Sequence, residues 1–169
     1  LPKQRQCCGR PAFSAGNLDE AEKLGRHNLA LLAAGAGETP IIFLEPSCYS
    51  MFAEDYRELK LEGAETVSAR SFLFENFIGQ LLEDEPDALA FKPQKERIVI
   101  HAHCHAKALT NPAAMQKLAA RLPRRTAELL ATGCCGMAVS FFILASKYEL
   151  SLKIAGPLIE KVTRQPYGK

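Results

Sequence analysis

Two kinds of hydrophobic run alternate along the chain: amphipathic stretches with helical spacing, and short apolar runs bounded by proline, glycine or polar residues. Residues 17–34 have apolar positions three and four apart. Asn17 followed by Glu20 is typical of a helix start, so a helix is predicted there. The run PIIFLEPSC is too short for a helix. It predicts a buried strand at 41–44 that delivers Cys48 just past its carboxyl end.

The same alternation continues to the middle of the chain. The elements expected next are a helix at 50–59, a short strand within ETVSARSF at 65–72, and a helix at 72–82. The following stretch, EDEPDALAFKPQKE, is polar and contains two prolines, which is typical of a linker or a surface loop. We therefore predict a first half, a linker loop and a second half, at residues 1–85, 86–96 and 97–169.

The second half repeats the pattern of the first. The elements expected are a strand RIVIHAHC ending at Cys104, a helix from Asn111-Pro112 to Arg121, a strand TAELLATGC ending at Cys134, and a helix from 138 interrupted near Gly156-Pro157. Strands separated by helices favour an α/β fold in which helices cover a parallel sheet. The recurrence of two adjacent cysteines before a glycine suggests two similar, pseudo-repeated halves.

Six cysteines are the candidate ligands of the chain: Cys7, Cys8, Cys48, Cys104, Cys134 and Cys135. Because the carboxyl ends of parallel strands form one crevice, the cysteines that follow predicted strands should share one side of the sheet. Thiolates are soft ligands that select zinc, copper(I) or iron–sulfur clusters. Two adjacent thiols can reach one centre only from a turn, and the glycines beside both pairs permit such a turn. An ordinary buried thiol explains a single cysteine such as Cys48, but fits the whole set poorly.

The run HAHCH offers further donors. On a continuous strand, His101, His103 and His105 would share one face and Cys104 would point to the other, which argues against a Cys/His nucleophile. A neutral imidazole here either ligates iron or zinc or makes hydrogen bonds at the crevice edge, and we favour the second role. Lys107 would supply positive charge beside the thiolates.

Composition and charge narrow the function classes. The chain has 169 residues with 21 basic and 19 acidic side chains interspersed, so no nucleic-acid or anionic-membrane footprint is expected. No apolar run reaches the ~18 residues of a membrane span. The start, Leu1-Pro2, lacks a methionine and an apolar signal stretch, which suggests a fragment of a longer chain. Unpaired cysteines fit a reducing, cytoplasmic compartment.

Four segments together carry a family resemblance: QCCGRPAFSAGNLDEA, PSCYS, HAHCHAKAL and GCCGMA. They resemble the cysteine-rich CCG domain that occurs in heterodisulfide reductase and in the iron–sulfur subunits of glycolate oxidase and anaerobic glycerol-3-phosphate dehydrogenase. The nearest likeness is to the carboxyl-terminal iron–sulfur region of fused FAD-linked dehydrogenases. The resemblance implies two similar α/β halves and an iron–sulfur cluster, of the 4Fe–4S type, held by the six cysteines.

The sequence departs from the family pattern: the first lone cysteine of the pattern is absent, and Val139 and Phe142 stand where relatives tend to have glycine. Met51 stands where the second cysteine of Cys-x-x-Cys belongs, and no cysteine follows Cys135. Three ways of completing a ligand set stay open: one cluster shared by the two halves, His103 or His105 as a ligand, or loss of the cluster or its replacement by zinc.

The function implied is an electron-transfer module. In the resembled proteins a flavin domain oxidises a 2-hydroxy acid or a related substrate, and electrons pass through the iron–sulfur region to an acceptor such as a quinone. This chain has no flavin motif, so FAD and the substrate would belong to a partner domain or subunit, and no catalytic residue is assigned here. Such partners would bring a cytoplasmic chain to the inner membrane peripherally. The alternatives are a structural zinc or scaffold domain and a thiol–disulfide redox protein.

Overall fold

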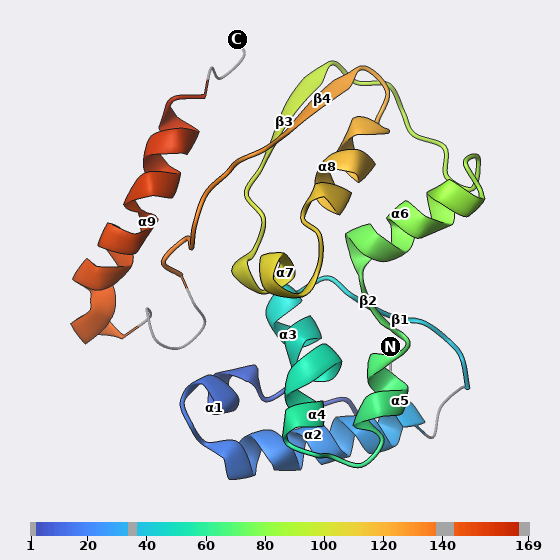
Figure 1. The fold of residues 1–169 in the computed structure, drawn as a ribbon, viewed down its shortest axis with the longest axis vertical. Helices are drawn as coiled ribbons and strands as arrows, with labels where there is room; N and C mark the ends of the chain where they lie inside the picture. The colour runs from blue at the N-terminus through green and yellow to red at the C-terminus, as the bar shows by residue number, and fades with distance from the viewer. Residues whose placement is uncertain (1–2, 34–36, 138–143, 166–169) are drawn as a thin grey trace. The chain divides into compact units, whose positions relative to one another are not determined.

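The fold is described from a computed structural model, which covers residues 3–33, 37–137 and 144–165. The chain forms two compact units (Figure 1). The first consists chiefly of Leu1–Leu73, and the second chiefly of Phe74–Met137 and Ala145–Lys169. Each contains helices and one two-stranded parallel sheet, so the predicted mixture of helices and parallel strands is confirmed.

The first unit places helices around a short sheet. Its elements are α1 (Arg10–Ser14), α2 (Leu18–Ala33), β1 (Ile41–Phe43), α3 (Pro46–Ser50), the π-helical turn η1 (Met51–Asp55), α4 (Tyr56–Glu58), α5 (Ala64–Ser68) and β2 (Ser71–Leu73). β1 pairs with β2 in register Ile41↔Ser71. Because α3, η1 and α4 follow one another without a break, residues 46–58 form one helical stretch.

Two sequence predictions for this unit are confirmed. Asn17 caps α2, because its Oδ1 accepts a hydrogen bond of 3.3 Å from the N–H of Glu20. The strand predicted at 41–44 is β1, but it is not buried as predicted, since Ile42 and Leu44 are exposed. The helix predicted at 50–59 begins earlier, at Pro46, since the Glu45 side chain accepts a hydrogen bond of 2.8 Å from the N–H of Ser47. Cys48 therefore lies inside a helix.

The strand predicted at 65–72 is wrong for most of its length. Residues 64–68 form α5, and only the end of the segment joins β2. Val67 is fully buried from a helix, because α5 packs on α2 and η1. Tertiary packing overrides the strand preference of a β-branched residue here.

The core of the first unit is aromatic and aliphatic. Tyr56, Leu29, Met51 and Val67 are almost completely buried. Phe52 contacts Tyr56 edge to face, with ring centroids 4.8 Å apart. This core includes one residue of the first cysteine pair, since Cys8 belongs to the same cluster of buried residues.

The second unit has its own sheet and covering helix. Its elements are α6 (Phe74–Asp84), β3 (Glu96–Ile100), α7 (Cys104–Leu109), α8 (Ala113–Ala120), β4 (Arg125–Leu129), the 3₁₀ turn η2 (Ala145–Lys147) and α9 (Tyr148–Thr163). β3 pairs with β4 in register Glu96↔Arg125, and α8 lies along these strands (Figure 1). The Gln116 amide donates to the carbonyl of Ala127, which ties α8 to β4 at 3.1 Å.

The two strands predicted to end at cysteines stop earlier. β3 ends at Ile100, because the His103 side chain caps α7, and Cys104 is the first residue of that helix. β4 ends at Leu129, five residues before Cys134. The helix predicted from Asn111-Pro112 is confirmed as α8.

The last predicted helix is confirmed only in its later part. The start expected at 138 lies outside the described residues. The expected interruption near Gly156-Pro157 is wrong, since α9 runs through Pro157. A proline removes one N–H donor, and the turns on either side hold the helix together. Among the described residues, no helix is both long enough and apolar enough to cross a membrane.

Gly25 in α2 is expected to be intolerant of a side chain. A Cβ there would lie 2.6 Å from Leu61 Cδ1 and 2.7 Å from Tyr56 Cε1. Gly25→Ala should lower the free energy of unfolding by about 1–3 kcal/mol through overpacking, measured by urea denaturation. The matched control is Gly79→Ala in α6, where no described atom lies within 4 Å; it should raise stability by about 0.5–1 kcal/mol. Equal effects at the two positions would contradict this packing.

Candidate functional site

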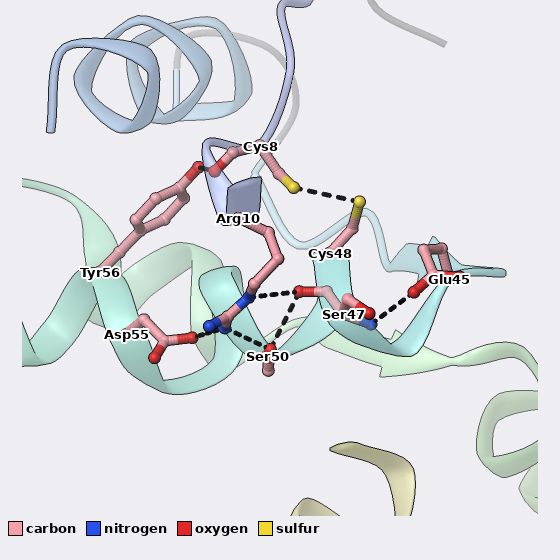
Figure 2. A network of polar contacts seen from close by, with 8 residues as sticks. All are labelled: Cys8, Arg10, Glu45, Ser47, Cys48, Ser50, Asp55 and Tyr56. Atoms are coloured by element: carbon pink, nitrogen blue, oxygen red, sulfur yellow. Dashed lines mark hydrogen bonds and ion pairs between the residues drawn. The ribbon is translucent and has the colours of Figure 1, made fainter. Parts of the chain in front are cut away.

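The first unit brings three cysteine thiols together. Cys8 Sγ lies 3.1 Å from Cys48 Sγ (Figure 2). The exposed Cys7 is close enough to this pair for its thiol to lower the pKa of Cys8. Residues 40 positions apart thus meet at the start of α1 and in α3.

A glycine makes the turn at the first cysteine pair. Gly9 has φ +81°, in the left-handed region that other residues rarely adopt. It also lies against α2, where an added Cβ would come within 3.2 Å of Ala21 Cα. The turn can therefore sit this close to α2 only without a side chain at position 9.

Side chains from two helices satisfy the backbone of this turn. Asn28 of α2 accepts a hydrogen bond of 2.9 Å from the N–H of Gln6 and donates one of 2.9 Å to the carbonyl of Cys7. The Tyr56 hydroxyl donates to the carbonyl of Cys8 at 2.5 Å (Figure 2). Buried backbone groups left unpaired would cost free energy, so these contacts fix the path of the turn.

Arg10 joins the turn to the helix that carries Cys48. Its Nε donates to the carbonyl of Ser47 at 3.3 Å, and its terminal nitrogen donates to the Ser50 hydroxyl and to the Asp55 carboxylate (Figure 2). Burial raises the pKa of Asp55, and the charge of Arg10 opposes that rise. The charge of Arg10 therefore favours the ionised form of this carboxylate.

The pKa values of the Cys8 and Cys48 thiols shift in opposite directions. The hydrogen bond between them raises the pKa of Cys8, with burial adding to the rise, and lowers the pKa of Cys48. Of the two thiols, Cys48 is therefore the one that ionises more readily, with Cys8 as the S–H donor. A thiolate is the form that acts as a metal ligand or as a nucleophile.

The second unit holds the other three cysteines. Burial raises the pKa of Cys104, and the charges of Cys134 and Cys135 raise it further. These thiols therefore lie within electrostatic reach of one another. The N–H of Gly136 donates to Cys134 Sγ at 3.4 Å, which is the kind of backbone support a bound thiolate receives.

Two lysines hold the loop that leads into the second pair. Lys107 donates to the carbonyls of Thr132 and Gly133, at 2.8 and 2.9 Å, and Lys161 of α9 donates to the carbonyl of Ala131. The positive charge expected at Lys107 is thus beside this loop, and its hydrogen bonds go to backbone oxygens.

Gly136 sits tightly against α9. Its φ is +74°, and a Cβ there would lie 2.3 Å from the carbonyl oxygen of Ser151. The loop that carries Cys134 and Cys135 therefore approaches a helix backbone directly, and only glycine fits.

In the HAHCH run, Cys104 lies close to two of the histidines, whereas a continuous strand would have placed it on the opposite face. Ligand atoms of His103, Cys104 and His105 all lie within 4.8 Å of one another. A strand would have separated the cysteine from the histidines, but the chain turns into α7 at this point. His103 Nδ1 accepts a hydrogen bond of 3.2 Å from the His105 N–H, which fixes its ring.

The expectation of one sheet edge for all the strand-end cysteines is wrong. The strands form two separate pairs, so Cys48 follows β1 in one unit while Cys104 and Cys134 follow β3 and β4 in the other. Sequence reasoning also missed Arg10, Asn28 and Tyr56. A signal existed for Asn28, which is a buried polar residue on the apolar face of α2.

With this geometry described, the chain can be compared with known proteins. Residues 1–53 match the family model of the cysteine-rich domain CCG. The match confirms the resemblance indicated by the motifs, over the segment that holds Cys7, Cys8 and Cys48.

Curated relatives are similar over most of the chain. It is 24% identical over 164 residues, 96% of its length, to a subunit of the anaerobic glycerol-3-phosphate dehydrogenase of Escherichia coli, and it covers 41% of that subunit. It is 30% identical over 152 residues, 85% of its length, to lactate utilization protein A of an Exiguobacterium species, of which it covers 60%. An uncharacterized iron-sulfur protein of Methanocaldococcus jannaschii is 30% identical over 107 residues, 63% of this chain and 19% of that protein. The chain thus spans less than two thirds of the length of each of these relatives. No solved structure matches the chain.

Gly136 is the position at which the second thiol loop should be most sensitive. Gly136→Ala should lower the free energy of unfolding by about 1–3 kcal/mol or more, because the side chain meets backbone and φ is positive. Gly133→Ala, where no described atom lies within 4 Å and φ is ordinary, should stay within about 0.5 kcal/mol of wild type. Urea denaturation measures both, and an unchanged Gly136→Ala would show that the loop does not pack on α9.

Proposed function

We propose that this chain is an electron-transfer domain that holds an iron–sulfur centre through its cysteine thiols and serves a dehydrogenase. The observation that carries the proposal is the meeting of Cys8 and Cys48, with Sγ atoms 3.1 Å apart, inside a segment matching a cysteine-rich family. An iron–sulfur cluster exchanges single electrons at a potential set by its environment.

The donors present fit such a centre. Thiolates are the ligands that iron–sulfur clusters use, and each unit contains three cysteines. The backbone N–H of Arg10 lowers the pKa of Cys8, and the N–H of Gly136 donates to Cys134 Sγ at 3.4 Å. Such N–H groups offset the negative charge of bound thiolates.

The proposed ligands are Cys7, Cys8 and Cys48 in the first unit, and Cys104, Cys134 and Cys135 in the second. A 4Fe–4S cluster takes four protein ligands in its usual form. In the second unit we assign the fourth position to His103 or His105, because their nitrogens lie within 4.8 Å of the Cys104 thiol. Zinc is the metal that competes for the same donors.

The two halves are proposed to be distant repeats, at 1–85 and 97–169 with the loop 86–96 between them. Each holds a Cys-Cys-Gly turn, a lone cysteine that follows a strand, and a pair of parallel strands. In each turn the glycine has positive φ.

The proposed partners rest on the names of two relatives and on the absence of a recognisable flavin motif from this sequence. Two relatives are a glycerol-3-phosphate dehydrogenase subunit and a lactate utilization protein, so a dehydrogenase partner for a hydroxylated substrate fits. We assign FAD and substrate oxidation to that partner, and a quinone or similar carrier to the acceptor. The chain would work in the cytoplasm and reach the inner membrane peripherally through these partners.

Anaerobic reconstitution with iron and sulfide tests the proposal. The chain should bind both, turn brown with broad visible absorbance, and give an electron paramagnetic resonance signal on reduction. Cys8→Ser and Cys48→Ser should each lose most of the iron of the first unit, since each removes a thiolate from the pair 3.1 Å apart. A colourless chain that purifies with stoichiometric zinc and takes up no iron would contradict the proposal.

The histidine assignment has its own test. His103→Ala and His105→Ala, separately and together, should reduce iron bound by a Cys8→Ser/Cys48→Ser chain, in which only the second unit can hold a centre. His27→Ala is the matched control, because this histidine belongs to α2 of the first unit and makes a hydrogen bond with the carbonyl of Gln4. Unchanged iron content and an unchanged spectrum in the double histidine variant would remove both residues from the ligand set.

A further inference from the structure

The geometry points to Arg10 as a positioning residue of the first thiol site, whose guanidinium, paired with Asp55, fixes Cys8 opposite Cys48. This inference rests on the proposed function, because it takes the two cysteines as ligands. Nothing in the Cys-Cys-Gly pattern requires an arginine at the next position, so the evidence is the set of contacts that Arg10 makes.

The guanidinium is buried and paired. The Arg10 side chain is 8% exposed and that of Asp55 13%. Its contacts with the Ser47 carbonyl and the Ser50 hydroxyl place two further hydrogen bonds on either side of Cys48 in the same helix. The ring of Phe13 lies under the guanidinium carbon, 5.2 Å from it, and closes the remaining side.

These contacts link the two cysteines through a short rigid path. Arg10 is two residues after Cys8, and Ser47 is one residue before Cys48. A bond from one to the other therefore limits how far the two thiols can separate. The Tyr56 contact to the Cys8 carbonyl limits the same turn from its other side (Figure 2).

Stability alone is a weak reason for such a pair. Burying two charges costs solvation that their attraction seldom exceeds, and apolar side chains of similar volume often stabilise as well or better. The guanidinium instead fixes the relative positions of its partners, because its planar group donates to three acceptors in fixed directions. A lysine would keep the charge but could not hold all three.

The charge has a second effect on the same site. The Arg10 guanidinium lies beside the helix turn that carries Cys48, since its Nε donates to the carbonyl of Ser47 at 3.3 Å, and a positive charge stabilises bound thiolates in general. Because the reduced form of a cluster is the more negative one, removing Arg10 should lower the reduction potential and removing the charge of Asp55 should raise it.

The position of the thiols can be tested without metal. The full chain, reduced and metal-free, is treated with dibromobimane, which becomes fluorescent only when it bridges two nearby thiols. The Cys8–Cys48 bridge is then identified by peptide mass spectrometry. Arg10→Gln and Arg10→Lys should both form this bridge several-fold more slowly than wild type. Asp55→Asn, which keeps an acceptor for the guanidinium, should stay close to wild type.

A matched control separates this effect from the loss of any ion pair. Arg57 and Glu65 form an exposed pair in the same unit, at 2.8 Å, away from the cysteines. Arg57→Gln should leave the bridging rate unchanged. Should Arg10→Gln fail to fold, Arg10→Lys carries the test. A wild-type rate in a folded Arg10→Lys or Arg10→Gln chain overturns the inference.

The reconstituted chain gives the second measurement, a redox titration followed by electron paramagnetic resonance. Arg10→Gln should shift the midpoint potential of the first centre downward, Asp55→Asn upward, and Arg10→Lys little. If Arg10 and Asp55 acted only on structure, the midpoint potential would not shift in opposite directions in the two variants. Shifts of the potential in the same direction therefore overturn the charge effect.

If the wild-type chain takes up no iron, the proposed function fails, and the bridging rates still test whether Arg10 positions the two thiols. If wild type binds iron and the Arg10 variants match it in both measurements, the inference fails alone.

Discussion

A turn that presents two adjacent thiols must leave several backbone groups without partners, and those groups can be buried only if side chains satisfy them. In the first unit Asn28 of α2 and Tyr56 of α4 meet this requirement, and Arg10 of α1 ties the turn to the helix that carries Cys48. The core below the turn is arranged to allow it: Gly25 has no side chain, which leaves space for the Tyr56 ring. The site and the hydrophobic core are therefore not separate features of this unit.

The second turn meets the same requirement by other means. Its support comes from cations and from a helix backbone: Lys107 and Lys161 donate to loop carbonyls, and Gly136 lies against α9. Lysine is a flexible point charge, whereas the arginine fork fixes direction. The two Cys-Cys-Gly turns thus both have a glycine with positive φ, but different neighbours support them.

The sequence alone predicted the elements better than their ends. Apolar runs located β1 and β3, although neither strand is fully buried: Ile42 is exposed in β1, and Glu96 and Arg97 are exposed in β3. The ends depended on caps that periodicity does not register, such as His103 on α7 and Glu45 on α3. All six cysteines were predicted, since thiols in pairs stand out by composition. The role of Arg10 could not be predicted, because it depends on a contact with Asp55, 45 residues away.

The cations near the thiols are already committed to protein partners. Arg10 is paired with Asp55, and Lys107 with two carbonyls, so neither needs a bound metal to be held in place. Part of the ordering cost of each loop is then met during folding, before the proposed metal centre binds. Positive charge held this way also favours the thiolate forms that a metal requires. Preorganisation of this kind explains why charged side chains are buried beside cysteines that could have been surrounded by apolar residues.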